Sequence, residues 1–316
     1  MQDRFKPVCK NARLAGVLLL SLWLLILTGC AATPRLAANT EQTLPREAMI
    51  EGVPFHAQRE YQCGPASLAM VLNHDGVDVA MERLIPQVFI PGREGSVQPE
   101  MLATVRRHGR IPYVLNDSLD ALLTEIAAGH PVVVMQNLSL PAWPMWHYAV
   151  AIGYDLEASE LILHSGEEAE RIESFRRFDA TWARSERWAF VALSPGELPS
   201  GVSEQRALQA ISAFEQVHGA GATLPAWEAF TARFSASSMG HFALGNARYA
   251  TGDAPGAIEA FRTSVAHRDD LGVAWLNLGL VLLAQGETDE ARQALGRAAE
   301  LPGDWQPRAR EALERL

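Results

Sequence analysis

The chain of 316 residues is acidic, with 37 Asp and Glu against 27 Lys and Arg and a formal net charge of −10. This balance argues against nucleic acid as a partner, because a phosphate backbone attracts basic surfaces. Only three cysteines occur, and the histidines lack metal-ligand spacing. The composition therefore predicts no disulfide framework, no metal site and no cofactor.

Residues 1–29 have the pattern of an export signal, with a basic start and an apolar run from Leu14 to Leu27. The run is shorter than the ~20 residues that a membrane-spanning helix needs. It ends in Leu27-Thr28-Gly29-Cys30, which resembles the bacterial lipobox. The resemblance implies cleavage before Cys30 and transfer of a diacylglycerol to its sulfur. An ordinary secreted protein or an uncleaved membrane anchor is the alternative.

Processing before Cys30 would change the charge and the location of the chain. Residues 1–29 carry four bases and one acid, a net of +3, so the mature chain would have a charge of about −13 (−10 − 3). Acyl chains on Cys30 would hold it to a membrane. Ala31 is not the aspartate that commonly retains lipoproteins at the inner membrane. By analogy with Gram-negative lipoproteins, we expect the outer membrane of the cell envelope, facing the periplasm.

Residues 30–49 show little periodicity and predict a tether, and residues 50–193 mix helical and strand patterns. Helices are expected from Cys63 to before Gly76, over about 79–87 and 98–108, and over 119–128 behind a Ser118 N-cap. Strands are expected over 132–135, 147–154, 161–163 and 188–193. Helices followed by an antiparallel sheet predict an α+β domain.

Cys63 stands at the start of the first of these helices. Free backbone N–H groups and the helix dipole stabilise a thiolate there, so we expect a nucleophile. His147, at the mouth of a strand-like segment, would be its base. Without the leader and the lipidated Cys30, Cys63 is the single free thiol, so no internal disulfide is expected. A buried, inert cysteine is the alternative.

Several short segments around the two reactive residues form a joint pattern. It consists of Val53-Pro54 and Gln58, then Cys63-Gly64-Pro65-Ala66, then His147-Tyr148-Ala149-Val150 and Gly153-Tyr154-Asp155. Over about residues 50–193 it resembles the papain-like cysteine peptidases that process bacteriocin leaders after a double glycine, and their secreted relatives. The resemblance implies a papain-like fold and peptide hydrolysis by Cys63 and His147. It also implies that Gln58 helps to form the oxyanion hole, a role for which Gln62 is a second candidate.

The third catalytic residue of that family, an aspartate commonly followed by proline, is absent. Alignment of the histidine hairpin places His164-Ser165-Gly166 in its position. An orienting carboxylate steadies the imidazolium, so its loss should weaken catalysis without necessarily abolishing it. Ser165, Glu167 or Glu168 could contact the histidine instead, and the sequence does not choose among them. Trp143-Pro144-Met145-Trp146, just before His147, either walls a substrate cleft or is local core.

Residues 194–203 have the composition of a linker, and residues 204–316 repeat with a period of 34 residues. Leu244-Gly245, Gly252, Ala257 and Phe261 recur as Leu278-Gly279, Gly286, Ala291 and Leu295. This resembles the tetratricopeptide repeat, in which Gly245 admits a close helix, Gly252 lies at the turn and Phe261 fills the gap. A degenerate unit is expected over 207–234 and a capping helix over 307–316. The resemblance implies an all-α domain that binds a protein partner.

The sequence therefore predicts a membrane-tethered thiol peptidase with an α+β papain-like domain and an all-α repeat domain. Its substrate would be a peptide or a protein. The rival hypothesis is a catalytically weak or inactive, peptidase-like adaptor that grips a peptide while the repeats recruit a partner. Acyl or peptidyl transfer through the same thioester is a third hypothesis.

Overall fold

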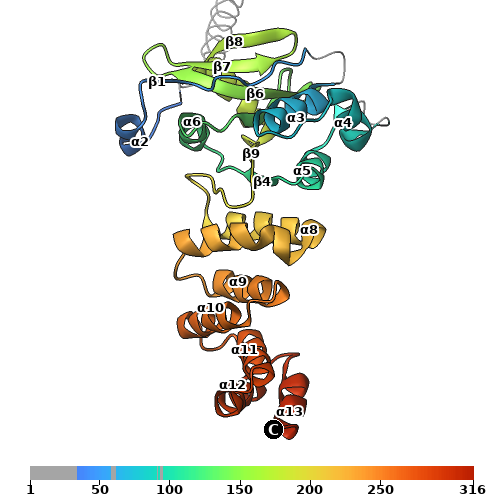
Figure 1. Ribbon diagram of the computed structural model, residues 1–316. Coiled ribbons are helices and arrows are strands. Elements are labelled where there is room, and N and C mark those ends of the chain that lie inside the picture. The colour runs from blue at the N-terminus through green and yellow to red at the C-terminus, as the bar shows by residue number, and fades with distance from the viewer. Residues whose placement is uncertain (1–33, 58–61, 91, 93–94) are drawn as a thin grey trace, which may run out of the picture. The chain divides into compact units, whose positions relative to one another are not determined.

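The computed structural model describes residues 34–57, 62–90, 92 and 95–316 (Figure 1). The predicted leader, Cys30 and Gln58 lie outside these residues. Leu36–Leu316 form one compact unit. Within the described ranges, no helix has both the length and the apolar character needed to cross a bilayer.

The first part of the described chain is mainly helical. Its helices are α2 (Ala38–Thr43), α3 (Cys63–His74), α4 (Met81–Val88), α5 (Gln98–Arg107) and α6 (Leu119–Ala127). The last four lie where the sequence predicted them, within two residues at each end. The predicted N-cap is also confirmed, because the Ser118 hydroxyl accepts a hydrogen bond from the backbone N–H of Ala121 at 3.2 Å.

The strands form one large antiparallel sheet and a separate short pair. The large sheet has the order β4-β9-β5-β6-β7-β8, and β1 pairs with β6. Its strands are β1 (Glu47–Met49), β4 (Ile111–Val114), β5 (Val132–Asn137), β6 (Trp146–Asp155), β7 (Glu160–Ser165), β8 (Glu168–Ser174) and β9 (Ala189–Leu193). The short pair is β2 (Phe89–Ile90) and β3 (Gly95–Ser96). Helices packed on an antiparallel sheet confirm the predicted α+β class.

The sequence analysis missed five strands (β1, β2, β3, β4 and β8) and two helices (α2 and α7). For four of these elements the structure gives a physical reason. β1 lies within the predicted tether, and its pairing with β6 shows that the sheet begins before residue 50. β4 contains Pro112, which reads as a strand breaker but is tolerated at this outer strand of the sheet. β8 is charged and exposed because it forms the opposite edge. The helix α7 (Phe175–Trp182) follows β8 and buries only three aromatic side chains.

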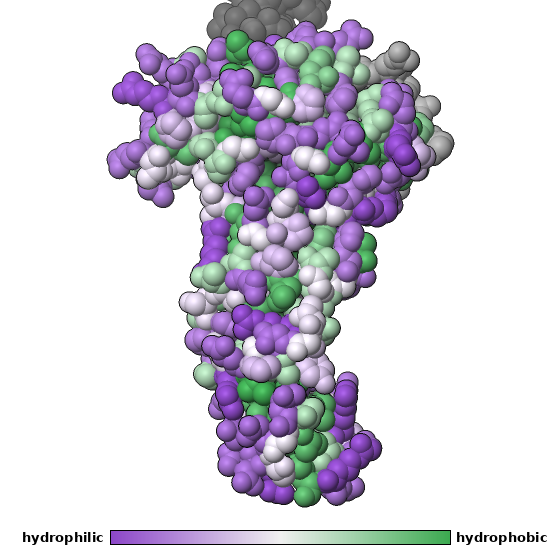
Figure 2. All heavy atoms as spheres, in the orientation of Figure 1, coloured by the Kyte–Doolittle hydropathy of each residue, from purple (hydrophilic) through white to green (hydrophobic). Residues whose placement is uncertain are grey.

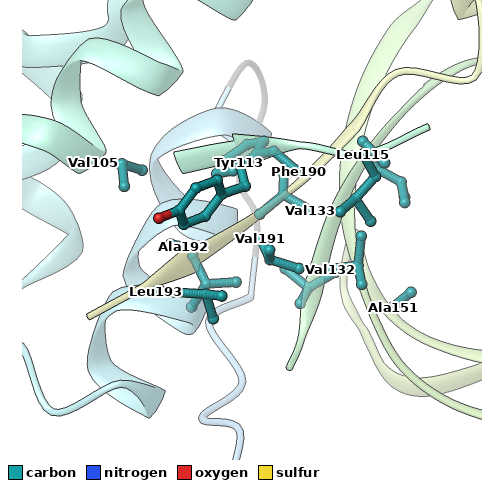
Figure 3. Close-up of a cluster of buried hydrophobic side chains, with 14 of the residues drawn as sticks. Val105, Tyr113, Leu115, Val132, Val133, Ala151, Phe190, Val191, Ala192 and Leu193 are labelled. Carbon is teal, nitrogen blue, oxygen red and sulfur yellow. The ribbon is translucent and has the colours of Figure 1, made fainter. Parts of the chain in front are cut away.

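The core lies between the sheet and the helices, and it fixes the strands that carry the site. Figure 3 shows Tyr113 of β4 and Phe190 of β9 packed with valines of β5 in this core. Val133 and Phe190 are register partners on neighbouring strands and are fully buried. β6 lies on the other side of β5, so its position is set by the same core.

The C-terminal part is a succession of helices (Figure 1): α8 (Glu204–Arg233), α9 (Ser238–Ala250), α10 (Ala254–His267), α11 (Gly272–Ala284), α12 (Thr288–Glu300) and α13 (Gln306–Glu314). α8 breaks at Gly219, where φ is 77° and ψ is 173°. Trp227 Nε1 donates to Glu215 Oε2 at 3.2 Å, although twelve residues of straight helix would span about 18 Å. The two halves of α8 therefore fold back on each other, as the predicted degenerate unit requires.

The glycines of the repeat have the predicted roles. A β-carbon on Gly245 would lie 2.6 Å from the ring of Phe261, so the close approach of α9 and α10 requires glycine there. Gly252 has a φ of +90° at the turn between these helices. In Figure 2, hydrophobic side chains interrupt the hydrophilic surface over the last repeats.

Candidate active site

The helix α3 places Cys63 at the edge of the core. Gly64–Leu72 are all buried, so the helix is held on every side and its first residue has a defined position. A β-carbon on Gly64 would collide with the side chain of Ser96 on β3. Glycine after the cysteine is therefore required by the close approach of β3.

Burial changes the electrostatics that the sequence predicted for Cys63. Backbone N–H groups of Tyr148, Gly64 and Cys63 itself act on the sulfur and favour the thiolate, as expected at a helix N-terminus. Burial is the larger effect, and it raises the pKa of the thiol. In this structure burial therefore outweighs the helix N-terminus and favours the thiol over the thiolate.

His147 is the second residue of β6, opposite Gln136 of β5. Its Nε2 lies 2.9 Å from the Oγ of Ser165, the last residue of β7. Glu168, one of the alternatives left open by the sequence, pairs instead with Arg171 at 3.8 Å. Ser165 is thus the residue that contacts the imidazole in the position of the missing aspartate.

The imidazole is held in its neutral form. Burial, with a further contribution from the positive charge of Arg171, lowers the pKa of His147 to about 4. If Nε2 carries the proton and donates to Ser165, Nδ1 is the basic nitrogen. The site therefore combines a neutral thiol with a neutral imidazole.

Tyr148 connects the two reactive residues. It follows His147 on β6, and its backbone N–H reaches the sulfur of Cys63. Its hydroxyl donates to the Ser96 carbonyl at 3.3 Å, which ties β6 to β3, the short strand packed against Gly64. The structure thus brings Cys63 to the same end of β6 as His147, as the sequence predicted.

His164 is a residue of the site region whose role the sequence analysis missed. It is buried, donates from Nε2 to the Val53 carbonyl at 3.2 Å, and accepts at Nδ1 from the N–H of Glu170 at 3.2 Å. Its ring also lies 5.3 Å from that of Phe55. His164 therefore anchors the segment that leads toward Gln58. Its position next to Ser165 in the sequence could have indicated that it lies in the site region.

The oxyanion-hole candidates stay predictions. Gln58 lies outside the described residues. Gln62 occupies the N-cap position of α3, and its buried Oε1 has no hydrogen-bond partner within the described part of the chain. An amide in that position is one residue from the reactive sulfur, so Gln62 remains a candidate.

The segment before His147 is not core. Trp143 is 76% exposed and Trp146 is 50% exposed, so the core interpretation of Trp143-Pro144-Met145-Trp146 is wrong. These side chains form a surface beside the histidine.

Comparison with known families matches both parts of the chain. Residues 50–189 match the model of the Peptidase_C39 like family. Residues 208–271 and 242–306 match the model of the tetratricopeptide repeat. No curated protein matches the chain.

Among solved structures, a proposed C39-like peptidase from Bacillus anthracis is 16% identical, with a TM-score of 0.41, over 48% of this chain and 98% of that one. A double glycine motif protease from an AMS/PCAT transporter, in complex with the leader peptide, is 19% identical, with a TM-score of 0.34, over 46% and 96%. MamA is 20% identical, with a TM-score of 0.33, over 35% of this chain, which spans 64% of the MamA chain.

Proposed function

Because the chain combines a C39-like peptidase domain with C-terminal tetratricopeptide repeats, we propose that it is a cysteine peptidase that uses Cys63 as nucleophile and His147 as base. The observation that carries the proposal is the 2.9 Å contact between His147 Nε2 and Ser165 Oγ, which would orient the imidazole without a carboxylate. The backbone contact of Tyr148 with the sulfur supports the pairing of the two residues.

The neutral state of both groups determines the mechanism. His147 Nδ1 takes the thiol proton while the sulfur attacks the peptide carbonyl, so the charges form only as the C–S bond forms. The imidazolium then gives that proton to the leaving amine, and water hydrolyses the thioester to release the acid. Ser165 would accept a hydrogen bond from the imidazolium with an uncharged oxygen, and this bond is weaker than one to a carboxylate.

The developing oxyanion needs donors. Gln58, or Gln62 in its place, would supply an amide N–H₂, and the backbone N–H of Cys63 would supply a second donor. The glutamine and the Cys63 N–H belong to the chain segment that enters α3, so a substrate carbonyl bound by these two donors would lie over the first turn of that helix.

Lipidation of Cys30 would hold the enzyme in the bacterial cell envelope, at the outer membrane facing the periplasm. The repeats would bind a protein partner, and the peptidase domain would bind a peptide or protein substrate. The repeat family and the fit of its glycines support the assignment of a protein-binding array.

Three features of the site favour a second function, a peptide-binding adaptor with little or no activity. The low pKa of His147 makes the imidazole a weak base, the raised thiol pKa makes the proton harder to remove, and Ser165 carries no charge. Each of these features lowers the rate of thiolate formation.

The test is cleavage of a synthetic peptide library by residues 34–316, followed by mass spectrometry, with Cys63→Ser and His147→Gln as variants. A peptidase gives products that both variants lose, while Trp275→Phe, in the repeats, cleaves normally. Binding of peptides without products, unchanged by Cys63→Ser, would establish the adaptor instead.

A further inference from the structure

The hairpin tip between β5 and β6, residues 138–146, concentrates exposed apolar side chains. Leu138, Leu140, Trp143, Met145 and Trp146 are between 43% and 76% exposed. The tip contains no Asp, Glu, Lys or Arg. Exposed apolar side chains gathered in this way mark an interaction surface.

The tip is ordered by its own hydrogen bonds. Asn137 Oδ1 accepts from the N–H groups of Ser139 at 3.1 Å and Met145 at 2.9 Å. The Leu138 N–H donates to the Met145 carbonyl at 2.9 Å, and the Trp143 N–H donates to the Leu140 carbonyl at 3.0 Å. Two further positions of the tip are prolines, which have no N–H.

This arrangement distinguishes a lipid from a peptide as the occupant. A surface that binds an extended peptide offers free backbone groups to it. A surface that enters a bilayer must satisfy its backbone groups internally, because hydrocarbon supplies no partners. In the tip, the N–H groups of Leu138, Ser139, Trp143 and Met145 have partners inside the protein. Its two tryptophans are the side chains that prefer the membrane–water boundary.

One positively charged side chain lies at the base of the tip. Arg184 donates to the carbonyls of Asn137 at 3.1 Å and Ser139 at 2.7 Å, so it lies against the base of the tip. Of the four arginines in residues 175–188, Arg187 pairs with Asp179 at 2.7 Å and Arg177 pairs with Glu173 at 3.4 Å, so Arg184 is the cation that the contacts place at the tip. An arginine that flanks an apolar tip attracts anionic lipid headgroups.

We propose that residues 138–146 insert into the interfacial layer of a bilayer that contains anionic phospholipid, with Arg184 at the headgroups. This contact is additional to any acyl chain on Cys30. Because Trp146 directly precedes His147, insertion of the tip would turn the candidate active site toward the bilayer. If the proposed peptidase function holds, the accessible substrates are then peptide segments close to the membrane.

The test uses residues 34–316, which contain the compact unit but neither the leader nor Cys30, and vesicles of phosphatidylethanolamine and phosphatidylglycerol. Co-sedimentation measures the partition coefficient. Leu140→Ser combined with Trp143→Ser should lower it by roughly tenfold or more, because both side chains would lose apolar contact with the bilayer. The matched control, Ile172→Ser with Val217→Ser, removes apolar side chains of 64% and 53% exposure elsewhere and should leave it unchanged.

Circular dichroism of both double variants checks that they are folded. The proposal is overturned if the parent chain does not bind vesicles, or if the control loses binding equally. It is also overturned if the tip variant binds vesicles normally but loses peptide binding or self-association, since the occupant is then a substrate or a second copy. Cys63→Ser should bind vesicles normally, so this result is independent of the peptidase proposal.

Discussion

The proton affinity of His147 is the most direct test of the site as described. An ordinary histidine has a pKa near 6.5, whereas burial and then Arg171 lower the pKa of His147 to about 4. At pH 5.5, about 3% of His147 would be protonated, against about 90% of an ordinary histidine. His130 provides an internal contrast, because its hydrogen bond to Glu125, 2.8 Å long, raises its pKa.

The same difference has a consequence for stability. Between pH 6.5 and about 4 the unfolded chain binds a proton at residue 147 that the folded chain does not bind. The folded state therefore loses stability as the pH falls through this window, by about 3 kcal/mol at most, at about 1.4 kcal/mol for each pH unit. The charge on the folded imidazole would appear only at the lower end of that range.

Two perturbations should move the pKa of His147 upward. Arg171→Ala removes a nearby positive charge, and Ser165→Asp places a carboxylate against Nε2. Ser165→Asp also introduces the aspartate found in the peptidase family that the sequence resembles. This carboxylate favours the thiolate–imidazolium pair, so the rate of Cys63 alkylation at neutral pH should rise.

The measurement is an NMR titration of histidine-labelled protein, with the His147 signal assigned by its loss in His147→Gln. The signal should stay in its neutral position down to about pH 5, while His130 titrates above pH 6.5. A His147 signal that titrates at or above pH 6.5 would refute the reasoning, because the imidazole would then be neither desolvated nor influenced by Arg171. No change in Ser165→Asp would refute the contact with Ser165.

Three further predictions concern single side chains. Ser165→Ala should lower kcat/KM by about 10- to 100-fold with little change in KM, because it leaves the His147 N–H without its partner at a cost of about 1–3 kcal/mol; an unchanged rate in a peptide assay would contradict this. Gly64→Ala should displace Ser96 and alter the alkylation rate of Cys63 while the melting temperature falls, and Ser96→Gly should restore both; failure of the pair to compensate would contradict the close contact. Gly245→Val should unfold the repeats at a lower temperature without changing that alkylation rate, as limited proteolysis and thiol labelling would show; a normal melting curve would contradict the packing seen at α9.

The local elements and the repeat were readable from the sequence because each depends on near neighbours. The N-cap at Ser118 and the turn glycine Gly252 are set by backbone geometry within a few residues. Gly245 and Phe261 could be recognised as partners because they lie on the two adjacent helices of a single 34-residue unit. Cys63 and His147 were identifiable because both reactive types stand at element boundaries.

Tertiary structure decided what surrounds those residues. The sequence left Ser165, Glu167 and Glu168 open, and the pairing of β6 with β7 selected Ser165 because it ends the strand beside the histidine. The helix N-terminus favours a thiolate at Cys63, but desolvation depends on how closely distant segments pack, and it reverses the result. The sequence by itself thus determined which groups could react. Packing across the sheet decided their protonation states and partners, because burial and hydrogen bonding between distant segments are properties of the assembled fold.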